Sequence, residues 1–195
     1  MQNYPLTLSF KLLAVAPQIK VTDATNQTVL YVRQKLLALK EDIKVYADEA
    51  QQQQVFQVNA DRIIDFSANY RITTPEGLPV GTVRRQGMKS LWKASYPIVD
   101  ANGESVGRIH EENPWVKVLD GLLGEIPGVG FVATLLINPS YLVDLRGQPV
   151  LRLRKRPAIF EGRFTLEKLA DFSDQEERLL LIGLLMMLLL ERGRG

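Results

Sequence analysis

The C-terminus constrains the fold of this chain more than any other segment. The last twenty residues, EERLLLIGLLMMLLLERGRG, contain an unbroken apolar run from Leu179 to Leu190 with charged residues on both sides. These twelve residues make about 18 Å of helix, whereas a membrane span needs about 20 apolar residues. The length therefore favours a buried core helix over a membrane anchor.

The residues that flank the run predict where this helix begins and ends. Ser173 and Glu176 have the spacing of a capping box at a helix N-terminus, and Arg192 followed by Gly193 suits a helix C-terminus. We therefore expect one helix from about Asp174 to Arg192. Because it is apolar on every side over three turns, the rest of the protein must surround it.

The chain upstream contains a repeated pattern that could supply the surroundings. YRITTPEGLPVGTV from Tyr70 and YPIVDANGESVGRI from Tyr96 share Tyr, Ile, Gly, Val and Gly at a spacing of 26 residues. A looser copy begins at Tyr141, and fainter copies begin at Ile19 and Ile43. Each copy has two alternating runs around a turn rich in Gly, Asn, Asp or Pro, which predicts a β-hairpin. Asn102-Gly103 is the clearest turn signal, since both residues tolerate positive φ.

Five hairpins supply about ten strands, and the runs RQKLLALK, ADRIIDFSA and PAIFEGRFTLEKL link or extend them. The copies vary in length, which argues against a solenoid or propeller. A barrel of about eight strands is filled by its own side chains, whereas wider barrels hold a central helix. The sequence therefore predicts one mainly β domain over residues 1–195, a closed antiparallel barrel of about twelve strands around the buried C-terminal helix.

Serial hairpins with a G-x-x-V-G-x-[VI] turn, followed by a short and very hydrophobic C-terminal helix, resemble the LURP-one-related family. The structural relatives of that family are the phospholipid scramblases and the C-terminal domain of Tubby proteins. The resemblance extends from about Lys11 to Glu191 and implies a twelve-stranded barrel around a central helix. Tubby domains bind phosphoinositides through basic residues outside the barrel, so the resemblance also implies a lipid-headgroup role without assigning individual ligands.

One segment interrupts the hairpin pattern. Asn113-Pro114 is typical of a helix start, so we expect a short helical excursion over about 114–124 that packs on the barrel. The alternative is that the segment 114–137 contacts a membrane or a protein partner. The apolar face for that contact would comprise Trp115, Leu119, Leu122 and Leu123.

Two basic clusters are candidate sites for anionic ligands. The first comprises Arg84, Arg85, Lys89 and Lys93, with Trp92 interleaved, and the second comprises Arg152, Arg154, Lys155 and Arg156. In the second cluster, alternation predicts that Leu151 and Leu153 face inward while Arg152 and Arg154 face water. Basic residues beside an aromatic side chain suit an anionic membrane surface. The alternative is an ordinary charged outer face of an exposed sheet.

The residues offer little for catalysis or metal binding. The chain has no cysteine and one histidine, His110, and it has no G-x-S-x-G motif. The stretch from Asp100 to Ser105 resembles a fragment of a calcium loop, but a hairpin turn explains it better. We therefore expect no catalytic residues, no metal, no cofactor and no enzymatic activity.

Composition narrows the classes of partner and the compartment. The chain is 46% hydrophobic and 24% charged with a net charge of +2, which indicates a globular protein and does not favour a nucleic-acid binder. The N-terminus lacks the basic segment of a signal peptide, and the absence of cysteine fits a reducing compartment. We expect a cytoplasmic protein, with peripheral membrane association if it binds lipid; the sequence does not fix its oligomeric state.

Three hypotheses of function follow, in order of preference. The first is a non-catalytic barrel that binds anionic lipid headgroups or a membrane surface through the two basic clusters. The second is a protein-interaction or scaffold module that uses the segment 114–137, and the third is a nucleic-acid binder that uses the same cations. Scramblase-like transport is disfavoured, because a terminal helix that fills the barrel cannot also span a bilayer.

Truncation of the chain tests the enclosed helix. Ending the chain after Phe172 removes the whole apolar rod, so the product is expected to aggregate and to show no cooperative thermal transition. Circular dichroism during heating, with light scattering, measures both properties. A soluble truncated chain that melts cooperatively would contradict the prediction.

Overall fold

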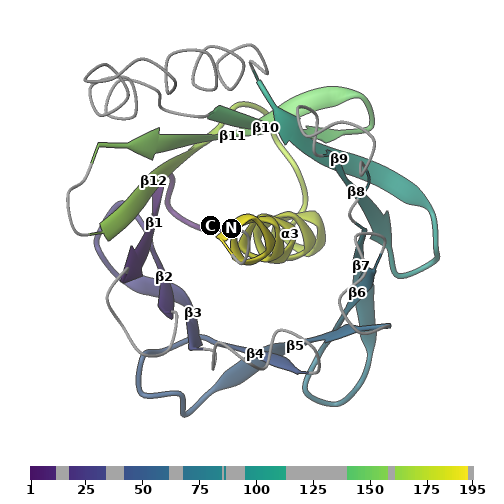
Figure 1. Ribbon diagram of the computed structural model, residues 1–195, viewed down its shortest axis with the longest axis horizontal. Coiled ribbons are helices and arrows are strands. Elements are labelled where there is room, and N and C mark those ends of the chain that lie inside the picture. The colour runs from purple at the N-terminus through teal and green to yellow at the C-terminus, as the bar shows by residue number, and fades with distance from the viewer. Residues whose placement is uncertain are drawn as a thin grey trace, which may run out of the picture.

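The structure is a computed structural model, and it describes residues 1–11, 18–33, 42–61, 68–84, 86, 95–112, 140–157 and 161–192. Within these residues the chain forms twelve strands followed by one helix, α3. The strands surround α3 in a closed ring (Figure 1). The predicted closed antiparallel barrel of about twelve strands with a helix inside is therefore confirmed.

Strands that follow one another in the sequence are also neighbours in the barrel. Each such pair is antiparallel, and β1 pairs with β12 to close the ring, with Leu6 opposite Leu166. In chain order the strands are β1 (Leu6–Lys11), β2 (Gln18–Thr22), β3 (Thr28–Arg33), β4 (Ile43–Tyr46), β5 (Gln54–Ala60), β6 (Asn69–Thr73), β7 (Pro79–Arg84), β8 (Ser95–Asp100), β9 (Ser105–Glu111), β10 (Ser140–Leu145), β11 (Gln148–Arg156) and β12 (Glu161–Lys168).

The five repeated segments are the hairpins β2–β3, β4–β5, β6–β7, β8–β9 and β10–β11, as predicted. The run PAIFEGRFTLEKL contains β12. Strand β1 was not predicted, although Leu6, Leu8 and Phe10 alternate with polar residues, because it belongs to none of the repeated hairpins. The runs RQKLLALK and ADRIIDFSA lie mostly outside the described residues.

The turn between β8 and β9 shows the role of the residue three positions before glycine, which is Asp100 in this copy of the repeat. Gly103 has a φ of +88°, whereas Asn102 does not take a positive φ. The Asp100 carboxylate accepts hydrogen bonds from the backbone amides of Asn102 and Glu104, each at 2.9 Å. The stretch that resembles a calcium loop is thus a hairpin turn closed by its own first side chain.

The same device recurs in two other turns. Asp23 accepts hydrogen bonds from the amides of Thr25 and Gln27, each at 2.9 Å, with Asn26 at a φ of 63°. In the turn between β6 and β7 the Thr74 hydroxyl accepts a bond from the Leu78 amide at 3.3 Å, with Gly77 at a φ of 86°. The sequence repeat is therefore largely a repeat of turn chemistry.

Helix α3 has the predicted bounds, Asp174–Arg192, and the predicted capping box. The Glu176 amide donates to Ser173 Oγ at 3.3 Å, and the Ser173 amide donates to Glu176 Oε2 at 2.8 Å. Both bonds satisfy amides that a helix start leaves without a backbone partner. In addition, the Arg146 guanidinium pairs with Glu176.

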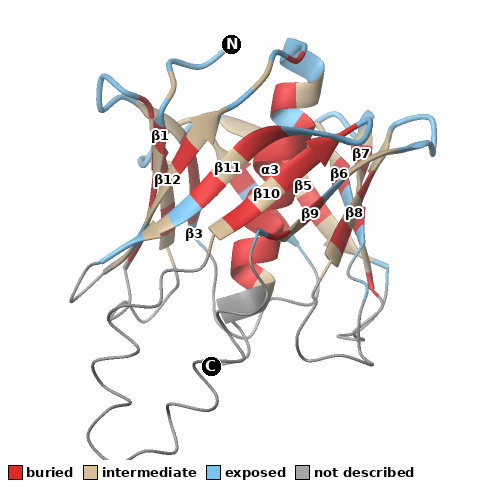
Figure 2. Ribbon diagram, turned by 90° about the horizontal axis from the view of Figure 1, so that it is seen from above, coloured by how far each residue is buried: buried red, intermediate tan, exposed pale blue. Residues whose placement is uncertain are grey.

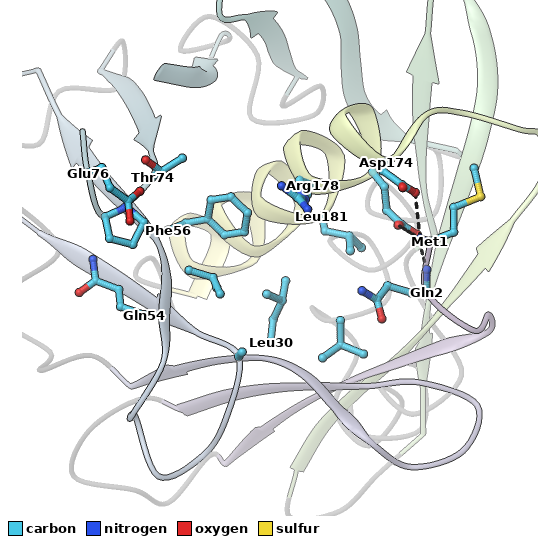
Figure 3. Close-up of a pocket in the computed structure, with 15 residues that line it drawn as sticks. Met1, Gln2, Leu30, Gln54, Phe56, Thr74, Glu76, Asp174, Arg178 and Leu181 are labelled. Carbon is cyan, nitrogen blue, oxygen red and sulfur yellow. Dashed lines mark hydrogen bonds and ion pairs between the residues drawn. The ribbon is translucent and has the colours of Figure 1, made fainter. Parts of the chain in front are cut away.

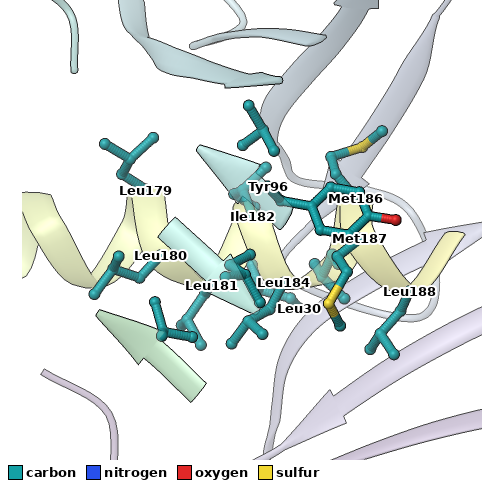
Figure 4. Close-up of a cluster of buried hydrophobic side chains, with 14 of the residues drawn as sticks. Leu30, Tyr96, Leu179, Leu180, Leu181, Ile182, Leu184, Met186, Met187 and Leu188 are labelled. Atoms are coloured by element: carbon teal, nitrogen blue, oxygen red, sulfur yellow. The ribbon is translucent and has the colours of Figure 1, made fainter. Parts of the chain in front are cut away.

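The apolar part of α3 is enclosed on all sides. Every residue from Leu179 to Leu189 is buried (Figure 2). Side chains from several turns of the helix lie among barrel side chains such as Tyr96 and Leu30 (Figure 4). No helix among the described residues has the length and hydrophobicity needed to cross a membrane.

Two glycines allow α3 to lie close to one wall of the barrel, which is formed by β6 to β9. A Cβ atom at Gly81 in β7 would lie 2.6 Å from Leu179 Cδ1 and 2.5 Å from the Val99 carbonyl oxygen. Gly183 faces Val83 and Ile98, but a Cβ atom there would be 3.4 Å from the nearest atom. The Gly81 contact thus leaves no space for a side chain, whereas Gly183 leaves space for a methyl group.

Alanine at these two glycines is expected to have different effects. Gly81→Ala forces a backbone or helix shift and should lower the free energy of unfolding by about 1–3 kcal/mol. Gly183→Ala is the matched control, because an ordinary contact and better helix propensity should leave stability unchanged or raise it by up to about 1 kcal/mol. Urea denaturation of both variants measures the difference. Equal destabilisation would show that the close approach at Gly81 does not fix the helix position.

Candidate functional site

Strand β11 carries arginines on its outer face. Leu151 and Leu153 are fully buried, Arg152 is partly buried, and Arg154 and Arg156 are exposed. The predicted alternation, with the leucines inward and Arg152 and Arg154 outward, is confirmed. These arginines differ in the contacts that they make with other side chains of the barrel.

Arg152 is part of the barrel's own structure. Its guanidinium lies 2.8 Å from a Glu112 oxygen, and its side chain is 27% exposed. The other Glu112 oxygen accepts a hydrogen bond from the Ser140 hydroxyl at 2.6 Å. These contacts join the ends of β9, β10 and β11, so Arg152 is less suited to an external ligand than the arginines that follow it.

Arg154, Arg156 and Arg163 form an exposed basic group, which we call the arginine edge. Arg156 and Arg163 are directly opposite each other in the β11–β12 pairing, and like charges in that position are unfavourable for a sheet. Arg156 donates to the neutral Thr165 hydroxyl at 3.0 Å, and the Arg154–Glu167 pair is long, at 3.7 Å. The sequence analysis missed Arg163, because only the strand register places it beside Arg156.

Lys155 does not share the face of the arginine edge. It follows Leu151 and Leu153 in the alternation of β11 and lies opposite Phe164. The second cluster predicted from the sequence therefore divides into outward arginines and one lysine on the other face of the strand.

Arg84, from the first predicted cluster, lies at the same end of the barrel as the arginine edge. Strands β3, β7 and β11 all start at a hairpin turn, and their last residues are Arg33, Arg84 and Arg156. Three strands separate β7 from β11 in the ring, so Arg84 and Arg156 belong to one end but not to one patch. Arg84 Nε donates to Asn69 Oδ1 at 2.5 Å. Asp42, Asp61 and Glu112 lie at the same end, so its cations are accompanied by carboxylates. We call this end the basic end after its strand-terminal arginines; Arg33 was not singled out in the sequence.

The remaining predicted site residues lie outside the described residues. This applies to the helical excursion at 114–124 and to the whole contact segment 114–137. It also applies to the following cationic and apolar residues: Arg85, Lys89, Trp92, Lys93, Trp115, Leu119, Leu122 and Leu123.

The described hairpin turns lie together at the other end of the barrel (Figure 2). Carboxylates outnumber cations among the residues there. The turns and the segment around the start of α3 contribute Asp23, Asp48, Glu49, Glu76, Glu104, Asp171, Asp174, Glu176 and Glu177, against Arg146, Lys168, Arg178 and the Met1 ammonium. Hydrogen bonds from the backbone amides of Gln53 and Gln52 hold the pKa of Asp48 below its usual value. A bond from Thr74 does the same for the pKa of Glu76. We call this end the acidic end.

The single histidine belongs to a small network on the outer surface. His110 Nε2 and Arg108 Nε each lie 3.0 Å from the same Asp144 oxygen, and His110 Nδ1 lies 3.0 Å from the Glu111 carbonyl oxygen. Asp144 is 8% exposed, so the two basic side chains satisfy a carboxylate that is largely removed from water. In the part of the chain that the structure describes, no three His, Asp or Glu side chains gather in a metal-binding group.

The fold defines a class of protein: among the described residues, a closed twelve-stranded barrel around its own C-terminal helix. The family model of the LURP-one-related proteins matches residues 28–121, slightly less than half of the chain. The resemblance to this family is thereby confirmed over that stretch, which is shorter than the region from Lys11 to Glu191 in which the sequence suggested it. No curated protein and no solved structure gives a match.

The pairing around Glu112 predicts a pH-dependent contribution to stability. The Ser140 hydroxyl, and then the Arg152 guanidinium, hold the pKa of Glu112 below its usual value of 4.5. A lowered folded-state pKa gives stability that is complete above 4.5 and is lost as the pH falls through the folded-state value. Glu112→Gln should therefore be less stable than the natural protein at neutral pH, by at most about 1 kcal/mol, and equally stable in acid. Urea midpoints over a pH series measure this; a difference that does not change with pH would contradict it.

Proposed function

We propose that the protein is a non-catalytic barrel that binds the anionic headgroups of membrane lipids through its basic end. The observation that carries this proposal is the arginine edge, in which Arg156 faces Arg163 across two paired strands. An anion that contacts both guanidinium groups would be attracted by two cations at once.

The chemistry of the arginine edge suits phosphate. Guanidinium groups bind phosphate oxygens in pairs and are weakly hydrated, so they lose little when they contact a headgroup. Arg154 and Arg156 alternate along β11 on the same face, and Arg163 adds a third cation from β12. Three cations within one small area match the charge of a multiply phosphorylated or clustered anionic headgroup better than an isolated arginine would.

The separation of charge between the two ends favours one orientation at a membrane. An anionic surface attracts the basic end and repels the acidic end with its turn carboxylates. The protein would therefore approach with the ends of β3, β7 and β11 toward the lipid. Such contact is peripheral and places the protein on the cytoplasmic leaflet, where anionic lipids are concentrated.

Vesicle binding tests this function. The protein is expected to sediment with vesicles that contain phosphatidylserine or a phosphoinositide, and to remain in solution with neutral phosphatidylcholine vesicles at low salt. Each cation near the surface contributes about 1 kcal/mol, so Arg156→Ala should weaken binding about fivefold, and Arg156→Ala with Arg163→Ala about thirtyfold.

Arg71→Ala is the matched control, because Arg71 is an exposed arginine in the middle of β6 and outside the basic end. It should leave vesicle binding unchanged. Equal binding to neutral vesicles, or equal losses in the Arg71 and Arg156 variants, would refute the proposal. Stronger binding to a short RNA than to anionic vesicles at the same salt concentration would favour a nucleic-acid binder.

A further inference from the structure

The interior of the barrel is not filled at the acidic end. A cavity of about 460 Å³ lies between the first turns of α3 and the turn ends of β3, β4 and β5. Leu30 from β3, Phe56 from β5 and Leu181 from α3 line its inner part (Figure 3). These side chains are 6%, 7% and 5% exposed. The floor of the cavity therefore has little contact with bulk water, although it borders empty volume.

Residues 1–4, which we call the strap, lie at the mouth of this cavity. Met1 and Gln2 line the cavity together with the first turns of α3, and both lie beside the start of the helix (Figure 3). Strand β1 begins only after the strap, at Leu6, and pairs with β2 and β12. The strap is thus outside the strand ladder, so the ring of strands can stay closed when the strap moves.

A buried carboxylate of α3 holds the strap. Glu177 is 3% exposed, and its Oε1 accepts a hydrogen bond from the Gln2 amide at 3.0 Å. Its Oε2 lies 3.6 Å from the Met1 ammonium. Among the described residues these are the partners of that carboxylate, and a buried carboxylate without partners is unfavourable. The strap therefore supplies the charge and the hydrogen bond that Glu177 requires.

Other polar contacts of the strap lie at the surface. The Met1 ammonium is 2.8 Å from Asp174 Oδ1, and that aspartate side chain is 68% exposed. The Asn3 carbonyl oxygen accepts a hydrogen bond from the Ala24 amide at 2.9 Å. Met1, Gln2 and Asn3 are themselves exposed. Ion pairs and hydrogen bonds that water can replace hold a segment only weakly.

One aromatic side chain anchors the strap to the barrel. Tyr4 is half-buried, and its ring meets Phe172 edge-on, with the ring centroids 6.2 Å apart. Phe172 is 5% exposed and directly precedes the capping box of α3. If this contact breaks, water that enters the mouth can solvate Glu177. The opened state therefore does not contain a dry and unpaired carboxylate.

We propose that the strap is a detachable lid, which closes the cavity while Glu177 and Phe172 hold it. Its release opens the barrel interior to small neutral molecules and leaves the ring of strands intact. The lid lies at the opposite end of the barrel from the arginine edge. It is therefore independent of the proposed lipid-headgroup function.

Thiol labelling measures the release directly, because the natural sequence contains no cysteine. In the full chain, Leu30→Cys places one thiol at the floor of the cavity, and Leu181→Cys places one on the opposite wall. The small neutral reagent N-ethylmaleimide should label both far more slowly than an exposed thiol. The labelling rate then reports the population of molecules with the strap released.

Variants that weaken the strap should speed labelling of the Leu30→Cys thiol. Tyr4→Ala removes an aromatic pair and should raise the rate about fivefold. Glu177→Gln keeps the size of the side chain but removes its attraction to the Met1 ammonium, so the rate should rise about threefold. Glu104→Gln is the matched control, because it removes a carboxylate of the β8–β9 turn instead, and it should leave the rate unchanged.

Urea separates release of the strap from unfolding of the barrel. Release exposes little surface, so the labelling rate at Leu30→Cys should hardly change at low urea concentration. Val143→Cys is the matched control, at a fully buried position of β10 that does not line the cavity. Its thiol should be labelled only through unfolding, at a rate that rises steeply with urea.

Three results would overturn the proposal. The first is an equally steep dependence on urea at Leu30→Cys and Val143→Cys. The second is labelling of Leu30→Cys at the rate of an exposed thiol, and the third is an unchanged rate in both the Tyr4→Ala and Glu177→Gln backgrounds. Circular dichroism melting checks that each variant is folded.

Discussion

The apolar surface of α3 must be removed from water on every side, and the rest of the structure depends on this requirement. Each fully buried leucine contributes about 1.5–3 kcal/mol, and the helix buries every residue from Leu179 to Leu189. A closed ring of strands gives such a rod neighbours in all directions. Closure by β1 and β12 also leaves no sheet edge open to another chain.

The same topology explains why charge separates between the two ends. Consecutive antiparallel strands bring the described hairpin turns to one end, and these turns use carboxylates to hold their own backbone amides, as at Asp23 and Asp100. Three of the five strands that leave the described hairpin turns, β3, β7 and β11, finish in arginine at the other end, whereas β5 and β9 do not. The acidic end thus arises because the turns use carboxylates as hydrogen-bond acceptors for their backbone amides. The negative charges gather on one surface because the described turns lie at the same end of the barrel.

The features that were predicted from the sequence are those that depend on residues close together in the sequence. The capping box fixed the start of α3, and alternation with Asn-Gly and related turns located five hairpins. Strand β1 was not predicted because it belongs to no local hairpin motif of the repeat and its partner, β12, lies at the far end of the chain. Arg163 was missed for a related reason: its position opposite Arg156 is a matter of register between strands. The close approach of α3 to β7 depends on the lack of a side chain at Gly81, which no periodicity reveals.

The order of elements along the chain has a consequence for biosynthesis. The residues that fill the barrel are made after the residues that surround them, since α3 follows the twelve described strands. At roughly 5–20 residues per second, the nascent polypeptide displays its inward-facing leucines, isoleucines and valines for several seconds before the core segment leaves the ribosome. The strands of each hairpin can pair during that interval, but their apolar faces remain exposed to water. The barrel strands are therefore synthesised before the helix that they surround. A chaperone that binds exposed apolar segments would act in the interval before α3 emerges.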